Sequence, residues 1–230
     1  MPNVFVRLLN DVFSLVFPNQ CLGCGKELFA NQKIICFFCE LELPMTYFHL
    51  CDNKEMRHSI SINAQVNELY SLYFFKENSL LEILLYHLKY QQNKTIGQFL
   101  GQKLSVIIKA KNNHYNGIIG VPLHPKRKRK RGYNQKDIIG RSIANACGIP
   151  YVENILIRTK NTPALAKSTG NRAEIVRNAF ALNPAKKIAA GHYLLIDDIF
   201  TTGATLKACS AVLLSDSNLQ ISIATIAFRE

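Results

Sequence analysis

The sequence predicts an α/β protein, with a parallel sheet flanked by helices and a small metal-binding segment at the N-terminus. Short apolar runs alternate with segments of helical periodicity, which is typical of βαβ units. One apolar run, Tyr193 to Ile196, leads into two adjacent carboxylates and a hydroxyl-rich loop, as expected of a strand that ends at a binding site. Four cysteines in two C-x2-C pairs predict the metal-binding segment.

The composition limits the classes of function. The chain has 230 residues, 48% hydrophobic and 19% charged, which describes a globular protein of one medium domain plus a small appendage. The formal charge of +12 favours polyanionic partners such as phosphorylated metabolites or nucleic acid. No apolar run is long enough to cross a membrane, so we expect no membrane insertion and a cytoplasmic location.

The N-terminal stretch 4–17 has apolar residues at helical spacing. Asp11 lies in its middle, and no small-residue cleavage site follows it, which argues against a signal peptide. We therefore expect an amphipathic helix that packs on its own protein.

The four cysteines predict a structural zinc site. A C-x2-C turn brings two thiolates within reach of one ion, and a second pair completes a tetrahedral set. Two disulfides are the main alternative, which a cytosolic location disfavours, and an iron–sulfur cluster remains open without a supporting feature. We place this segment in residues 1–55 and the main domain in residues 56–230. The predicted ligands are Cys21, Cys24, Cys36 and Cys39.

The elements of the main domain follow from periodicity and from turn residues. Alternating Tyr and Leu predict a strand at 68–75, and Ser79 is expected to cap a helix at 80–90. A second helix is expected at 98–109 and a third at 138–146, the latter stopped by Gly148 and Pro150. A fourth helical pattern begins near Leu206. The other predicted strands are 117–121, 155–157, 180–182, 193–196 and 221–228.

The hydroxyl-rich loop after residue 196 fits a ribose 5-phosphate. Backbone N–H groups at a helix N-terminus bind anions, a glycine lets the chain approach the anion closely, and threonine hydroxyls donate hydrogen bonds. Carboxylates suit ribose hydroxyls or the shell of an Mg²⁺ ion. A solvated loop with Thr201 or Thr202 capping the next helix is the alternative. The candidate residues are Asp197, Asp198, Thr201, Thr202, Gly203, Ala204 and Thr205.

Six consecutive cations, Lys126 to Arg131, follow the strand that ends at Val121. Like charges repel, so we expect a loop that is mobile until an anion neutralises it. A pyrophosphate cradle and a nucleic-acid contact are the functional interpretations, and a solvated surface loop is the alternative. Because ligands bind beyond the carboxyl ends of parallel strands, we expect the loops after Val121, Ile157 and Ile196 at one edge of the sheet.

These motifs together resemble the ComF family (ComFC/GntX-like proteins). The resemblance rests on the paired C-x2-C, Leu88-Lys89-Tyr90, Pro122-Leu123-His124-Pro125, Arg131-Gly132-Tyr133-Asn134-Gln135 and the Asp-Asp loop, in the family's order. It implies a type I phosphoribosyltransferase-like fold with a zinc knuckle, and a site for phosphoribosyl pyrophosphate (PRPP) with Mg²⁺. It also implies a role in DNA uptake and natural transformation, with single-stranded DNA and a competence helicase as partners.

The resemblance also assigns residues. It implies catalytic roles for Asp197, Asp198 and Arg131 and PRPP contacts along the loop at 197–205. It implies a pyrophosphate- or nucleic-acid-binding set of Lys126, Arg127, Arg129, Arg131, Asn134, Gln135, Arg158 and Arg172. Between Arg158 and Arg177 the chain departs from the family pattern, with Ala164, Thr169 and Ile175 where Gln, Arg and Asn are expected. These departures weaken the case for turnover more than the case for PRPP binding.

Three functions are compatible with this sequence. The first is displacement of pyrophosphate from PRPP by a nitrogen nucleophile, although no segment identifies the acceptor. The second is single-stranded nucleic-acid binding without turnover, supported by the charge and by Tyr133. The third is a regulator that senses PRPP.

Overall fold

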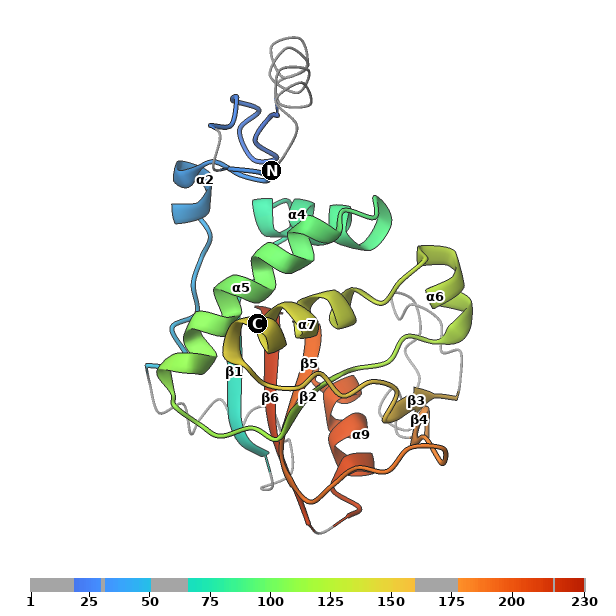
Figure 1. Ribbon diagram of the computed structural model, residues 1–230. Helices are drawn as coiled ribbons and strands as arrows, with labels where there is room; N and C mark the ends of the chain where they lie inside the picture. The colour runs from blue at the N-terminus through green and yellow to red at the C-terminus, as the bar shows by residue number, and fades with distance from the viewer. Residues whose placement is uncertain (1–18, 30–31, 51–65, 160–177, 217, 230) are drawn as a thin grey trace, which may run out of the picture.

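The structure, a computed structural model, describes residues 19–29, 32–50, 66–159, 178–216 and 218–229. Four strands form one sheet in the order β1-β6-β5-β2 (Figure 1). Every neighbouring pair in this sheet is parallel, which confirms the predicted fold class. The bounds are Val66–Phe74 for β1, Gly117–Gly120 for β2, Gly191–Phe200 for β5 and Leu219–Phe228 for β6.

Helices cover both faces of the sheet (Figure 1). α5 (Lys94–Ala110) and α7 (Gln135–Cys147) pack on one face with α4 (Leu80–Tyr90) beside α5, and α9 (Ala204–Leu213) packs on the other face. The side chains of β5 alternate between the two cores: Leu194 and Ile196 join the first, and Leu195 joins the second. Burial on both faces explains why this strand is a continuous apolar run.

Local sequence sets the helix ends. The Ser79 side chain accepts a hydrogen bond from the Glu82 N–H at 3.3 Å and caps α4, as predicted. Gly148, in the left-handed region with φ 69°, ends α7 as predicted. α5 begins at Lys94 rather than at residue 98, because its first turn is stabilised by burial of Ile96.

The N-terminal segment packs onto the main domain. Its short helix α2 (Phe37–Leu41) follows the second cysteine pair, and Cys21, Cys39 and Leu43 belong to the same core cluster as α4 and α5. The chain then runs along β1, where Thr46 N–H donates to the Leu72 carbonyl at 3.1 Å. The predicted helix at 4–17 and the predicted boundary at residue 55 lie outside the described residues. Within the described ranges, no helix combines the length and apolar character needed to cross a bilayer.

The predicted strands at 155–157 and 180–182 exist but do not join the parallel sheet. β3 (Leu156–Arg158) and β4 (Phe180–Leu182) pair antiparallel with each other in a separate two-stranded sheet. Beside β2, the described chain adds only one parallel bridge, between Ile118 and Tyr151. The predicted strand 155–157 therefore does not belong to the main sheet, because three-residue strands do not reveal their partner. Residues 160–177 of the loop that follows it lie outside the described residues.

The six cations do not form a free loop. They lie in helix α6 (Pro125–Arg131), whose capping residues are all present in the sequence. The His124 ring nitrogen Nδ1 accepts from the Lys126 N–H at 3.2 Å, Pro125 occupies the first turn, and Gly132 ends the helix with φ 78°. Lys and Arg are good helix formers, so these caps outweigh the repulsion between like charges.

Candidate active site

Two buried carboxylates lie near the carboxyl end of β5. Asp197 is 5% exposed and Asp198 7% exposed. Both belong to the strand, which continues to Phe200, so the prediction that the strand ends at Ile196 was too short by four residues. Asp197 lies in register with Thr225 of β6, and the Asp198 N–H donates to Asp197 Oδ1 at 2.8 Å.

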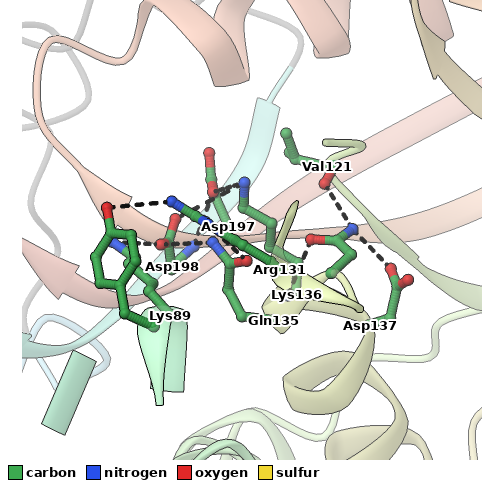
Figure 2. Close-up of polar contacts among 10 residues, drawn as sticks. Lys89, Val121, Arg131, Gln135, Lys136, Asp137, Asp197 and Asp198 are labelled. Carbon is green, nitrogen blue, oxygen red and sulfur yellow. Dashed lines mark hydrogen bonds and ion pairs between the residues drawn. The ribbon is translucent and has the colours of Figure 1, made fainter. Parts of the chain in front are cut away.

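Two lysines from different helices neutralise this acid pair (Figure 2). Lys89, in the last turn of α4, places Nζ 2.6 Å from Asp198 Oδ2. Lys136, in the first turn of α7, places Nζ 3.2 Å from Asp197 Oδ1 and 3.9 Å from Asp198 Oδ1. All four side chains are largely buried, so the pairing is weakly screened by solvent. Buried charges of this kind need such partners, and both acids have one.

The surroundings separate the pKa values of the two acids. Burial raises the pKa of Asp197 from 3.8 to about 7, opposed by Lys136 and reinforced by the neighbouring Asp198 carboxylate. Burial would also raise the pKa of Asp198, but Lys89 and Lys136 hold it well below 3.8. The pair therefore keeps one firmly ionised carboxylate and one that titrates near neutrality, a difference typical of functional acid pairs.

A chain of polar contacts connects Asp198 to the basic helix. Gln135 Nε2 donates to Asp198 Oδ2 at 3.1 Å, and Arg131 donates to Gln135 Oε1 at 3.2 Å. The Arg131 guanidinium also lies 5.0 Å from the ring centroid of Tyr90 and donates to its hydroxyl at 3.3 Å. Arg131 and Gln135 thus approach the acid pair, as the predicted site requires.

The loop after β5 leads directly into α9. Thr201 and Thr202 are exposed, and Gly203 precedes the helix with φ 67°. A Cβ on Gly203 would lie 2.7 Å from Phe200 Cζ, so this position excludes a side chain on steric grounds as well as by its backbone angle. In the described chain no side-chain hydrogen bond caps α9, so the alternative that Thr201 or Thr202 acts only as a helix cap is wrong. The first N–H groups of the helix, at Ala204 and Thr205, have no acceptor inside the helix and can bind an anion.

The predicted basic set divides into two groups. Arg131 and Gln135 approach the acid pair, whereas Arg129, Asn134 and Arg158 line a separate cavity of about 660 Å³. Asn134 has other partners than the acids: its Nδ2 donates to the Val121 carbonyl at 3.2 Å and to Asp137 Oδ1 at 2.8 Å.

The basic set has three further members, and Arg158 of the cavity has a second contact. Lys126 is exposed and Arg127 half-buried on α6. Arg158 lies in β3, with its guanidinium 5.1 Å from the Phe180 ring centroid. Arg172 lies outside the described residues, as do Ala164, Thr169 and Ile175.

The four predicted cysteine ligands converge. Their Sγ atoms all lie within 4.8 Å of one another, and Cys24 Sγ is 3.8 Å from Cys36 Sγ. Zinc–sulfur bonds of about 2.3 Å at tetrahedral angles place sulfurs about 3.8 Å apart, so the spacing fits zinc. Backbone N–H groups of Gly23 and Cys36 donate to Cys21 Sγ at 3.4 and 3.2 Å, which stabilises a thiolate.

Sequence reasoning missed the two lysines as partners of the acids. Lys89 appeared only within a family motif, although its place beside the buried Leu88 at the end of an amphipathic helix was a usable signal. Lys136 has no such signal, because it follows two polar residues at a helix start. Asp137 and Tyr151, which meet through a 2.8 Å hydrogen bond in the cavity wall, were also missed.

The curated proteins that are similar in sequence to this chain carry competence or DNA utilization names. The chain is 34% identical over 200 residues to "Competence protein F" of Haemophilus influenzae, covering 84% of this chain and 83% of that protein. It is 28% identical over 211 residues to "Competence protein ComFC" of Streptococcus pneumoniae, covering 89% and 78%. It is 25% identical over 150 residues to "DNA utilization protein YhgH" of Salmonella typhi, covering 62% of this chain and 65% of that protein.

Solved structures give more distant matches. Adenine phosphoribosyltransferase from Leishmania tarentolae aligns with a TM-score of 0.38 and 12% identity, covering 62% of this chain and 74% of that one. This similarity is too distant to support a statement about the site. No protein-family model matches the chain.

Proposed function

Because the chain belongs to the ComF family of competence proteins, we propose that it binds PRPP with Mg²⁺ at the acid pair and the adjoining loop, and acts in DNA uptake. The observation that supports this proposal is the buried pair Asp197–Asp198, three residues before a Thr-Thr-Gly-Ala-Thr loop that opens a helix. The helix N-terminus suits the 5-phosphate, and the carboxylates suit the two ribose hydroxyls.

The two lysines that pair with the acids would also contact the pyrophosphate of PRPP. Lys89 contacts Asp198 Oδ2, and Lys136 contacts Asp197 Oδ1. A ribose that binds there must share these oxygens or displace an ammonium group, which then becomes available for the pyrophosphate. In a transfer reaction the bond from the anomeric carbon to pyrophosphate breaks and the bond to a nitrogen acceptor forms. In this proposal Lys89, Lys136 and Arg131 would stabilise charge on the leaving pyrophosphate. Mg²⁺ would enter with the pyrophosphate and neutralise part of its charge.

The four-cysteine cluster supports a second part of the proposal, a structural zinc ion held by Cys21, Cys24, Cys36 and Cys39. All four positions of a tetrahedral site are filled by protein sulfurs, which leaves none for a substrate. The ion would therefore stabilise the fold rather than take part in chemistry.

Isothermal titration calorimetry with PRPP and Mg²⁺ tests the binding site. We expect saturable binding to the wild-type chain and at least a hundredfold weaker binding to the Asp197→Asn/Asp198→Asn variant. Asp216→Asn is the matched control, because Asp216 lies in the turn after α9, where its side chain accepts from the backbone and side-chain N–H groups of the nearby Asn218. Equal affinity of the acid-pair variant and the control would refute the site.

Single-stranded nucleic-acid binding is a second candidate function, favoured by one surface. Lys126, Lys128, Arg129 and Lys130 are exposed on α6, and Arg131 joins this helix to Tyr90 of α4. Tyr90 and Tyr86 are 57% and 52% exposed, with ring centroids 5.1 Å apart. Exposed aromatic rings beside cations suit stacked bases and a phosphate backbone. A competence helicase that delivers single strands would be a matching partner.

Fluorescence anisotropy with a labelled oligonucleotide tests this second function. We expect affinity that falls steeply with added salt. Tyr86→Ala should weaken binding by roughly tenfold or more, as loss of one stacked base does. The control is Tyr47→Ala, which removes an equally exposed ring on a different segment. No binding at low salt would exclude this function.

A further inference from the structure

A second cavity lies beside the acid pair and shares none of its charged residues. It has a volume of about 660 Å³ and is bounded by α6, the start of α7 and the segment 151–158. Neither carboxylate of the acid pair, neither of the paired lysines and no residue of the loop at 201–205 lines it. The start of α7 separates the two sites: Gln135 and Lys136 contact the acids, whereas Asn134 and Asp137 line the cavity.

Asp137 gives the cavity wall a hydrogen-bond acceptor. Its Oδ1 accepts from Asn134 Nδ2 and from the Tyr151 hydroxyl, each at 2.8 Å. Its Oδ2 accepts no hydrogen bond from the described residues, so Asp137 can still accept from a ligand. Tyr151 is itself fixed, because a Cβ on Gly120 or on Gly140 would lie 2.5 Å from its side chain. The carboxylate is therefore held in position before a ligand arrives.

Cations also line the cavity. Lys128 and Arg129 of α6 line the cavity, and neither forms an ion pair within the described chain. Arg141, in contrast, pairs with Glu153 and stacks on the Tyr151 ring. The two unpaired charges suit a phosphate group.

The lining also includes apolar side chains, among them Leu123, Val152 and Ile155. A volume of this size that combines apolar side chains with fixed polar groups is typical of small-molecule sites. A ligand that fits has an anionic group, an apolar body and a hydrogen-bond donor. We propose that this cavity binds a mononucleotide, with the phosphate at Lys128 and Arg129 and a base or sugar donor at Asp137. This site is independent of the proposed PRPP site.

An NMR titration of the whole chain with AMP tests the proposal, with methyl and amide signals as the readout. We expect saturable shifts at Val152, Ile155 and Ile157, and none at 201–205. Ribose 5-phosphate lacks the base and adenosine lacks the phosphate, so each should bind at least tenfold more weakly. A single-stranded oligodeoxyadenylate that shifts the same signals would identify a DNA strand as the source of the nucleotide.

Variants locate the binding. Asp137→Asn keeps an oxygen for Asn134 and Tyr151 but removes the second acceptor, and it should weaken AMP binding about tenfold. Lys128→Ala should do the same, whereas Lys109→Ala removes an equal, exposed charge at the end of α5, outside the cavity, and should have little effect. Affinity should persist in Asp197→Asn/Asp198→Asn. Absence of saturable shifts, shifts confined to 201–205, or equal effects of the two lysine variants would overturn the proposal.

Discussion

Replacing Lys89 by methionine should strongly destabilise the folded chain, because it leaves a buried carboxylate without its nearest counter-charge. The Lys89 and Asp198 side chains are 18% and 10% exposed, and their charged atoms are 2.6 Å apart. Removal of one partner from such a pair costs about 3–5 kcal/mol. Gln135 and the more distant Lys136 remain near Asp198, so we expect about 3 kcal/mol for Lys89→Met.

Urea unfolding at neutral pH measures this loss, and a double-mutant cycle assigns it. In the Asp198→Asn background, Lys89→Met should cost less than about 1 kcal/mol, because no charge is left unpaired. Lys103→Met is the matched control: it breaks an ion pair with Glu40 whose side chains are 38% and 30% exposed, which is worth at most about 1 kcal/mol. An equal effect of Lys89→Met in both backgrounds would refute the pairing.

The pH dependence of the Lys89 variant follows from the lowered pKa of Asp198. A carboxyl whose folded-state pKa lies below 3.8 contributes stability at higher pH, and this contribution is lost as the pH falls through the folded-state pKa. The difference between Lys89→Met and the wild type should therefore shrink as acid protonates Asp198. A difference that stays constant down to pH 3 would contradict the ionic explanation.

Three further changes test other parts of the structure. In urea unfolding, Gly203→Ala should destabilise the chain more than Gly148→Ala. Both variants replace a glycine in the left-handed region, but only the Cβ added at residue 203 meets a neighbour, Phe200 Cζ at 2.7 Å. Equal losses of stability in the two variants would contradict this. The pKa of Asp197 is about 7, so the fraction of molecules with an ionised Asp197 rises from about a tenth at pH 6 to about nine-tenths at pH 8. PRPP affinity should therefore rise about tenfold over this range. Calorimetry should find a smaller rise in Asp197→Asn. Removal of the proposed zinc ion by a chelator should lower the melting temperature by about 10 °C, because its ligands Cys21 and Cys39 belong to the main core cluster. An unchanged melting curve after proven metal loss would exclude a structural role for the ion.

Local signals in the sequence predicted much of the fold. Ser79 and Gly148 mark helix ends through hydrogen bonding and backbone geometry that depend only on neighbouring residues. The continuous apolar run of β5 indicated a strand buried on both faces. The charge run at 126–131 was misinterpreted, because repulsion was weighed without the caps His124 and Gly132 that determine the helix.

The site was only partly predictable, because its partners come from distant segments. The two aspartates and the loop after them form one contiguous motif, so the sequence alone points to them as candidates. Lys89 and Lys136 reach the acids from two helices that are far apart along the chain. The position of Lys89 at the end of an amphipathic helix marks it as a candidate, but nothing local to either lysine identifies the aspartates as its partners. The division of the basic set into two groups depends on the direction in which the start of α7 points each side chain.

A crystal structure of the chain with PRPP and Mg²⁺ tests the central claim most directly. We predict the 5-phosphate on the N–H groups of the loop at 201–205, the ribose hydroxyls on Asp197 and Asp198, and the Lys89 ammonium moved from Asp198 toward the pyrophosphate. PRPP bound away from the acid pair, with the Lys89–Asp198 contact at 2.6 Å intact, would contradict the account.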